Sequence, residues 1–510
     1  MKKKYILLTA FIGVMLSACS DFLDRKPLTE PNNEEYLCSR AQVENYINGL
    51  YMALPAPSQY GMGVRGEEKN SDNILAEKYD LRLNGEYNAF SGSSEWQKGY
   101  QNLRNVNYFF YYYCVPENEE TEDVLSLKGE AYFLRAYWHF YLLTRFGDIP
   151  LMDRLWDENA TVAGLQIPPA SRSDVAKFIL EDLKTASEGM LQSRSKYSGL
   201  RISKEAAMIL AMRVALYEGS WEKYHKGTEF SETDNSDYFF KEVMKWGDEL
   251  FKAGLSLNTD ATDNEAVNPG DAFAHLFNKD DLSKITEAVF WKKYAGDGVF
   301  HGLGGLLGGG VVDNDGPAGV SKSLVDNYLN ADGTFINPND EKYKDFRSTA
   351  KGSKPMNVRA YDNTGTDEEI KEKNKDISSP NLNGDGNGKN ITGFHIRLGI
   401  DTTFVEGGSH MAIILFRYSE ALLAYAEAAE ELNLCNDDVL NKRPTQIDPN
   451  FTSFGYSLTP VMQEIRRERR AELAFQGFRQ DDLMRWAGHK LIKGQRGLGA
   501  YLGTDGVLYK

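Results

Sequence analysis

The sequence predicts a mainly α-helical protein made of stacked helical hairpins of the tetratricopeptide kind, with a loop-rich irregular region packed on them. Helical periodicity recurs along the chain, and most helical stretches come in pairs with short connections. Glycine and asparagine concentrate instead in one region, at about 295–410. No strict repeat of ~34 residues is present, so the prediction rests on the pairing. The expected helices are about 39–52, 94–114, 122–147, 173–191, 203–220, 236–253, 411–433 and 460–487.

Residues 1–18 are expected to form a lipoprotein signal peptide. A basic head precedes an apolar run at 5–18 that is too short to span a bilayer, which needs ~20 residues. The run ends in Leu-Ser-Ala-Cys19, which resembles the lipobox of bacterial lipoproteins, so Cys19 is expected to be the acylated first residue of the mature chain. Two or three acyl chains would anchor the protein firmly, because each buried methylene contributes ~0.8 kcal/mol. An ordinary signal peptide with a chance cysteine is the alternative.

The stretch 122–147 is expected to be a buried central helix. Large side chains such as Phe133, Leu134 and Trp138 occur at helical spacings and on more than one face. A helix that is apolar on several faces must be covered on most sides. Gly147 then favours a left-handed residue directly after the helix, and Pro150 stops the helix from continuing.

The stretch 203–220 is expected to pack closely against a neighbouring helix. Ala207, Ala211 and Ala215 recur at a spacing of four, and Ala206 stands beside them. Because side chains four residues apart share one face of a helix, these alanines would form a flat stripe that a second helix can approach.

Motifs for nucleotide, metal or catalytic chemistry are weak. The glycines at 302–310 lack the lysine and hydroxyl residue of a phosphate loop, and the seven histidines form no zinc motif. The stretch 381–386 starts like a calcium loop, but Thr392 stands where the bidentate glutamate is needed. A structural calcium ion stays open, and no other metal or cofactor is expected. The 74 acidic residues offer many carboxylate pairs, but none stands in a recognisable context for glycoside hydrolysis.

The last helical stretch is expected to begin at Pro460 and to end at Gly477, with a second helix behind it. Arg469 shares a row with apolar residues and is expected to face inward. Glu472 lies three residues further on, within reach to pair with it. We interpret Arg469, Glu472 and Arg485 as a structural ion-pair network that locks this hairpin; a ligand-binding or catalytic cluster is the alternative.

The net charge argues against two classes of partner. The chain carries a formal net charge of −16, and removal of the signal peptide takes away three lysines and no acid, which leaves −19. Nucleic acid and anionic lipid both require a basic face. After Cys19, the remaining cysteines are Cys38, Cys114 and Cys435, which allow at most one disulfide among them and fit no metal framework.

Several segments resemble the SusD/RagB family of outer-membrane nutrient-uptake lipoproteins. The clearest is 129–151, GEAYFLRAYWHFYLLTRFGDIPL, which is similar almost residue for residue to the family's FLRAYYYFDLVRLFGDVPL helix. The family's D-P-R motif departs at its middle residue, which is Phe346 here. Further matches follow in the family's order at 71–107, 199–217, 287–290, 321–333, 416–429 and 468–486.

The resemblance spans about 19–490 and implies a SusD-like fold, with helical hairpins at 19–290 and a C-terminal region at 291–510 that form one intertwined globular unit. It implies a non-enzymatic lipoprotein, anchored by lipid and exposed at the outer membrane of the cell. Such a protein binds oligosaccharides and delivers them to a SusC-like TonB-dependent transporter. A peptide-binding member of the family, a secreted glycoside hydrolase and a helical scaffold that binds only protein are the alternatives.

The ligand site is expected in two glycine-containing excursions between helices, at 75–94 and 294–319, because packed helices leave recognition to the segments between them. The resemblance places these excursions at the family's pocket. Trp96 is left out, because its spacing to later residues makes it the start of a packed helix. The candidate ligand-binding side chains are Tyr79, Tyr87, Phe90, Phe300 and His301.

Overall fold

The computed structural model describes the greater part of the helical regions and short pieces of the rest. The signal peptide and Cys19 lie outside the described residues. The described residues are 36–55, 68, 71–76, 92–156, 166–192, 196–231, 234–266, 271–294, 312–313, 316–328, 358–360, 366, 368–369, 392, 394–396, 398, 410–435, 456–491, 501–502 and 508–509.

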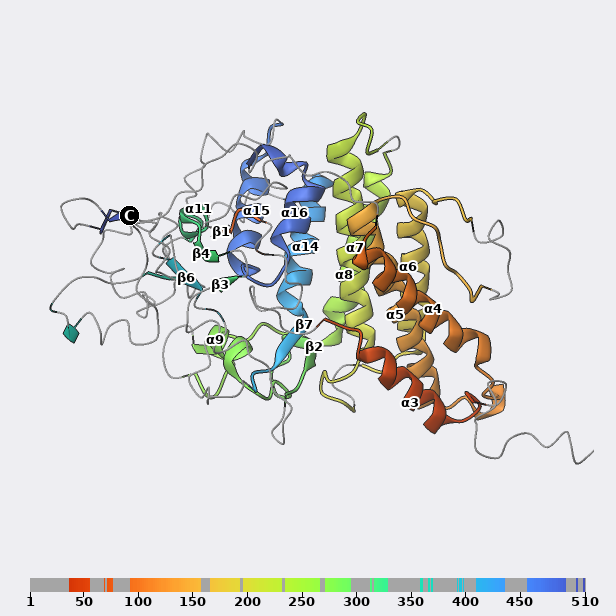
Figure 1. The fold of residues 1–510 in the computed structure, drawn as a ribbon. Coiled ribbons are helices and arrows are strands. Elements are labelled where there is room, and N and C mark those ends of the chain that lie inside the picture. Colours follow the sequence, from red (N-terminus) through yellow and green to blue (C-terminus); the bar gives the residue numbers. More distant parts are fainter. Residues whose placement is uncertain are drawn as a thin grey trace, which may run out of the picture.

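A layer of helices forms the N-terminal half of the molecule (Figure 1). From α4 to α8 each helix packs against the next one in the chain, and α3 packs against α4 and α5. This arrangement confirms the predicted stack of helical hairpins, and the observed bounds agree with the predicted ones within a few residues. The helices are α3 (Arg40–Tyr51), α4 (Ser94–Tyr112), α5 (Glu122–Phe146), α6 (Arg172–Gly189), α7 (Lys204–His225) and α8 (Ser236–Leu250).

The first five of these helices begin at a hydroxyl cap. In each, a serine or threonine side chain at the N-cap accepts a hydrogen bond from the backbone N–H three residues further on, which satisfies a donor that the helix leaves free. The capping residues are Ser39, Ser93, Thr121, Ser171 and Ser203. At the other end of α5, Gly147 has a φ of 74°, as the sequence predicts.

Helices α5 and α7 supply the centre of the hydrophobic core. In α5, Phe133 and Leu134 are fully buried and Trp138 is 2% exposed. In α7, the alanine stripe that includes Ala207 and Ala211 is fully buried, as predicted. Burial of one large apolar side chain contributes ~1.5–3 kcal/mol, so this layer accounts for much of the stability of the fold.

The C-terminal helices pack onto this layer (Figure 1). α14 (Tyr418–Glu431) contacts α7 and α8, α16 (Arg479–Arg485) contacts α7, and α15 (Pro460–Glu472) contacts α14. The predicted helix at 411–433 is wrong in its first part, which is the strand β7 (Ile413–Arg417). The run Ile-Ile-Leu-Phe suits a buried strand, and antiparallel pairing with β2 (Ala288–Lys292) satisfies its backbone.

Helix α15 ends earlier than predicted. Its last residue is Glu472, and the chain then takes positive φ angles of 64° at Phe475 and 79° at Gly477. The Phe475 ring is fully buried, so its packing compensates for a backbone conformation that is unfavourable for a side chain of this size. The expected stop at Gly477 is therefore wrong by about one helical turn.

Short antiparallel strands and two further helices lie beside the C-terminal helices. β1 (Ile74–Ala76), β4 (Gly316–Val320) and β3 (Val312–Asp313) form a sheet in the order β1-β4-β3. β5 (Val358–Ala360) pairs with β6 (Phe394–Ile396), and β8 (Tyr501–Leu502) pairs with β9 (Leu508–Tyr509). The helices α9 (Asp271–Asn278) and α11 (Lys322–Val325) are absent from the sequence prediction. A second hydrophobic cluster, which includes Leu276, Leu324 and Phe475, packs beneath them.

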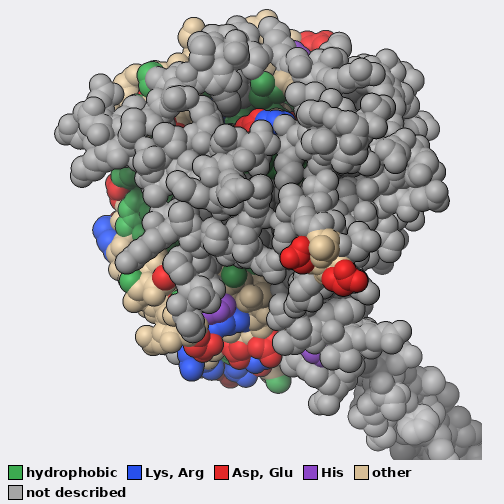
Figure 2. Space-filling view, turned by 90° about the vertical axis from the view of Figure 1, so that its left-hand side faces the viewer, with side chains coloured by type: hydrophobic (Ala, Val, Ile, Leu, Met, Phe, Trp, Pro, Cys, Tyr) green, Lys and Arg blue, Asp and Glu red, His purple; other side chains and the backbone are tan. Residues whose placement is uncertain are grey.

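Charges of both signs lie together on this side of the molecule. In the space-filling view, acidic and basic side chains gather along the lower edge (Figure 2). Ion pairs around α9 have this character, for example Lys293–Asp281 at 2.6 Å. Within the described ranges, no helix is long and apolar enough to cross a membrane.

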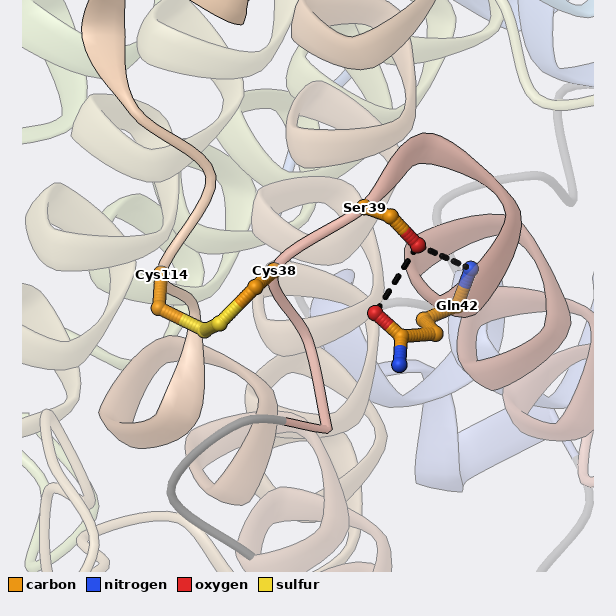
Figure 3. Close-up of a disulfide and its surroundings, with 4 residues drawn as sticks. All are labelled: Cys38, Ser39, Gln42 and Cys114. Carbon is orange, nitrogen blue, oxygen red and sulfur yellow. Dashed lines mark hydrogen bonds between the residues drawn. A yellow bond between two sulfur atoms is a disulfide. The ribbon is translucent and has the colours of Figure 1, made fainter. Parts of the chain in front are cut away.

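A disulfide joins Cys38 to Cys114 and fixes the start of the described chain to the end of α4 (Figure 3). The backbone N–H of Cys114 also donates to the carbonyl of Leu37 at 3.1 Å. Cys435 carries a free thiol, so the structure settles the state of all three cysteines in its described part.

Candidate functional site

The candidate ligand-binding side chains lie outside the described residues, but the ends of their two excursions are described. Tyr79, Tyr87 and Phe90 belong to the first excursion, and Phe300 and His301 belong to the second. The first excursion leaves β1 and returns at the start of α4. The second follows β2 and returns in β4.

The strands β1 and β4 bring two of these ends together. They pair antiparallel, with Ile74 opposite Val320, Leu75 opposite Gly319 and Ala76 opposite Ala318. The beginning of the first excursion and the end of the second are therefore hydrogen-bonded neighbours, although about 240 residues separate them in the sequence. The paired strands are called the loop stem below.

The other two ends also lie near each other. Lys98 is in the second turn of α4, and Lys292 is the last residue of β2. Burial lowers the pKa of the Lys292 ammonium, and the nearby charge of Lys98 lowers it further. Lys292 also donates to the carbonyl of Leu54 at 3.0 Å. The end of the first excursion and the beginning of the second therefore lie near each other as well.

The C-terminal helices hold the loop stem through Asp72. Arg479 donates to both carboxylate oxygens of Asp72, at 2.7 and 2.9 Å. Arg470 donates to the Asp72 carbonyl at 3.1 Å and to Asn73 Oδ1 at 2.9 Å. Burial alone would raise the pKa of Asp72, but the two guanidinium groups hold it well below its ordinary value. The Ser321 N–H donates to the Asn73 carbonyl at 2.9 Å, which ties β4 to the same turn.

A second buried carboxyl, Glu68, joins the turn to the chain after α15. It accepts from Asn73 Nδ2 at 2.9 Å and from the Gly477 N–H at 3.1 Å. Burial raises the pKa of Glu68 to about 7, although both hydrogen bonds oppose this change. The protonation of this group therefore changes near neutral pH.

Trp96 lies in the first turn of α4, directly after the first excursion, with part of its ring accessible. It is 37% exposed, and its ring packs against Tyr100 at 4.7 Å and Phe146 at 5.0 Å between centroids. The sequence analysis left Trp96 out because it starts a packed helix, and the structure shows a ring that both packs against these neighbours and stays partly exposed. Its position directly after the first excursion is the sequence feature that could have added Trp96 to the candidate ligand-binding side chains.

The predicted pair between Arg469 and Glu472 is wrong. Arg469 Nε lies 2.9 Å from both carboxylate oxygens of Asp482 on α16. Glu472 instead accepts from Arg417 on β7 at 2.8 Å. Spacing along one helix identifies reachable neighbours, whereas these partners come from other elements and present better geometry to the buried groups.

Arg485 joins α16 to α14. Its two terminal nitrogens donate to the Glu427 carboxylate at 2.6 and 2.7 Å, and its Nε donates to Asp482 at 3.0 Å. Trp486 Nε1 also donates to Glu427, at 2.6 Å. Burial would raise the pKa of Glu427, but Arg485 and its neighbours lower it to about 2. This carboxylate is therefore held as an anion by its partners.

A small cavity lies beside this network. Its volume is about 20 Å³, and Arg213, Glu420, Arg469 and Arg485 are among its lining residues. This is room for about one water molecule. The cavity is far too small for a sugar ring.

Metal sites are absent from the described part of the chain. No group of three or more histidine, cysteine, aspartate or glutamate side chains there could hold a metal ion. The calcium-like stretch at 381–386 lies outside the described residues. Thr392 is buried, and its hydroxyl accepts from the Phe394 N–H at 3.2 Å. A bound calcium ion stays a prediction.

Comparison with known proteins identifies two family models that match different parts of the chain. The model of the SusD family matches residues 312–501, and a model described as starch-binding and associating with the outer membrane matches residues 21–216. Two SusD-like proteins of Formosa agariphila are 24% and 22% identical over 246 and 244 residues. These matches cover 45% and 44% of this chain and 46% and 44% of those proteins, so the chain matches less than half the length of each.

Solved structures share the fold over most of the chain. A SusD-like protein of Bacteroides fragilis superposes with a TM-score of 0.67 at 21% identity, covering 95% of this chain and 93% of its own. A SusD-like carbohydrate binding protein of the same species has a TM-score of 0.64 at 18% identity, with 91% and 90% covered. The surface glycan-binding protein A of Bacteroides fluxus has a TM-score of 0.58 at 17% identity, with 91% and 93% covered. The predicted fold class is confirmed.

Proposed function

Because the chain belongs to the SusD/RagB family, we propose that it is a cell-surface lipoprotein that binds oligosaccharides and delivers them to a TonB-dependent transporter of the outer membrane. The observation that carries this proposal is the loop stem. The β1–β4 pairing places the ends of the two ring-bearing excursions side by side, so the excursions can contribute to one site. Trp96, in the first turn of α4 directly after the first excursion, adds a partly exposed ring.

Ring stacking is the expected mode of recognition. An aromatic ring offers an apolar face to the C–H side of a sugar, while polar groups nearby fix its orientation. We propose Tyr79, Tyr87, Phe90, Phe300 and His301 as contact residues, with Trp96 at the edge. The protein is proposed to bind without catalysis, since the buried carboxylates of the described residues around the loop stem and in the C-terminal helices are engaged by arginine, amide or backbone donors.

A glycan panel tests the proposal. Purified protein is titrated by calorimetry with neutral oligosaccharides, namely maltohexaose, cellohexaose, xylohexaose, laminarihexaose and mannohexaose, and with peptides, and each mixture is then analysed for cleavage. Binding of a glycan that stays intact supports the proposal, whereas released sugars support a hydrolase. Peptide binding in place of glycan binding would indicate the peptide-binding alternative. Binding of no small ligand, with co-purification of a barrel protein, would indicate a scaffold.

Substitution of the rings tests the site. The triple variant Tyr79→Ala, Tyr87→Ala and Phe300→Ala should bind the glycan at least about tenfold more weakly, which corresponds to ~1.4 kcal/mol. Tyr238→Ala is the control, because Tyr238 is a 43% exposed ring on α8. Full affinity in the triple variant would place the site elsewhere.

The anchor is tested separately. Cys19→Ala removes the thiol that acylation needs, so the variant should move from the membrane fraction to the soluble fraction. A conservative Ser20→Ala variant serves as the control and should remain with the membrane. A Cys19→Ala variant that still sediments with membranes, in cells that lack the transporter, would contradict the lipid anchor.

A further inference from the structure

The outer face of α4 carries an unusual set of side chains for an edge helix. The spacings of three and four place six residues on one face, about a third of the circumference, opposite the buried Leu103 and Val106. In order along the helix they are Gln101, Arg104, Asn105, Tyr108, Tyr111 and Tyr112. All six are exposed or half-exposed. They are called the tyrosine–amide stripe below.

The stripe has a single formal charge, that of Arg104. A terminal helix of a stacked repeat normally turns a polar, charged face to water. Here neutral amides and phenol rings take that place, and Tyr111 leaves 67% of its surface in water. Exposed aromatic rings of this kind are enriched at binding surfaces, because they offer a large apolar area at a small entropic cost.

The rings form a continuous row. Tyr108 and Tyr112 lie 4.4 Å apart between centroids, and Tyr111 lies 4.8 Å from Tyr112. From α3, Tyr46 stacks on Tyr108 at 5.9 Å, and Tyr36 lies 6.5 Å from Tyr46. Successive rings are thus about one sugar residue apart, so several rings can contact one linear ligand.

The row is held rigidly. The disulfide between Cys38 and Cys114 joins the chain beside Tyr36 to the chain just after the end of α4 (Figure 3). Tyr46 Oη donates to the Asn105 carbonyl at 2.8 Å, which ties α3 to the middle of the stripe. A surface that is ordered before the ligand arrives loses less conformational entropy on binding.

The chemistry of the stripe fits a neutral polyhydroxyl ligand. The rings offer apolar faces, and Gln101, Asn105 and Arg104 offer hydrogen-bond donors and acceptors to hydroxyl groups. A polyanion would need several cations, and the one arginine stands in a chain with a net charge of −16. Half of the six side chains are amides or a guanidinium, and the stripe exposes no Leu, Met or Phe, so its polar groups suit the hydroxyl groups of a sugar better than the apolar centre of a protein interface.

We propose that the tyrosine–amide stripe and the adjoining rings of α3 form a second glycan-binding surface, which binds neutral oligosaccharides by stacking on Tyr111 and Tyr112. This inference rests on the proposed function and extends it to a surface separate from the loop stem. The stripe would hold one part of a long glycan while the excursions hold another.

Calorimetry on the loop-site triple variant isolates the second surface. The mature protein carrying Tyr79→Ala, Tyr87→Ala and Phe300→Ala is titrated with the same panel of neutral hexasaccharides. Residual binding should remain, and adding Tyr111→Ala with Tyr112→Ala should weaken it at least fivefold. Tyr111→Trp should retain it, and Tyr238→Ala should leave it unchanged, since Tyr238 lies on α8.

A second measurement avoids substitutions altogether. Tyrosine nitration by tetranitromethane, mapped by mass spectrometry, should be slowed at Tyr111 by the bound hexasaccharide and unchanged at Tyr238. If the wild-type protein binds no glycan, both the proposed function and this inference fail. If it binds glycan, and neither the tyrosine substitutions nor nitration at Tyr111 respond, the second surface is refuted and the proposed function stands.

Discussion

Replacement of Arg485 by methionine should destabilise the protein strongly. Arg485 is 2% exposed and its partner Glu427 is completely buried, so the substitution leaves an anion in the core without its main partner. Removal of one member of a buried ion pair costs ~3–5 kcal/mol. Methionine keeps much of the volume of arginine, so the loss is electrostatic and not a cavity effect.

The pKa of Glu427 gives a second estimate of how much stability the ion pair with Arg485 contributes. It is about 2 in the folded protein and 4.5 ordinarily, and since a change of one in pKa corresponds to 1.36 kcal/mol, the ion-pair environment contributes about 3 kcal/mol at neutral pH. Because the folded pKa is depressed, this contribution is present above pH 4.5 and is lost as the pH falls through 4.5 towards 2. In Arg485→Met the pKa of Glu427 should rise, so the destabilisation should shrink in acid.

Urea unfolding followed by tryptophan fluorescence at pH 7 and pH 4 measures both effects. The double variant Arg485→Met with Glu427→Gln should recover part of the loss, because no buried charge remains unpaired. Lys245→Met is the control, since Lys245 pairs with Glu242 at the surface and should change stability by less than ~1 kcal/mol. An unfolding midpoint of Arg485→Met equal to wild type at pH 7, or a loss that is the same at both pH values, would refute the reasoning.

Three further predictions concern stability. Trp138→Ala should cost ~3–5 kcal/mol in urea unfolding, because the ring is 2% exposed in the centre of the core; an unchanged midpoint would contradict its place there. Substitution of Cys38 and Cys114 by serine opens a loop with a sequence separation of 76, which corresponds to about 4.5 kcal/mol of lost stability in the chain-entropy estimate, and reduction of the wild type by dithiothreitol should reproduce the effect. Glu68 has a raised pKa of about 7, so its contribution to the stability of the fold is greatest below pH 4.5 and is lost as the pH rises through 7. The stability of Glu68→Gln, measured by urea unfolding, should therefore rise by about 3 kcal/mol relative to that of the wild type between pH 4 and pH 8. Parallel profiles of stability against pH for the two proteins would show that Glu68 does not titrate in this range.

The helices could be predicted from the sequence because their signals are local. The periodicity of Trp138 and its neighbours and the stop at Gly147 both act within a few residues of the chain. The prediction failed where two local signals compete. The residues of β7 have an apolar pattern that fits either a helix or a buried strand, and only the presence of β2 as a neighbour decides between them.

The candidate site, too, could be predicted from the sequence only in part. The sequence located the two excursions and their rings, because rings outside helical periodicity are visible in the chain itself. It could not show that β1 and β4 are neighbours, that Trp96 stays partly exposed, or that the tyrosine–amide stripe faces water beside the disulfide. Exposure depends on which other elements cover a side chain, and no local pattern contains that information.

The sequence by itself determined most of the helical elements, the inward-facing Arg469 and the segments that leave the helices. The tertiary structure decided the partners: Arg469 pairs with Asp482, Glu472 pairs with Arg417, and Arg479 pairs with Asp72 across a sequence separation of 407. The physical reason is that a buried charge must be neutralised by whichever opposite charge the packing brings within hydrogen-bond distance, and packing brings together residues from distant parts of the chain.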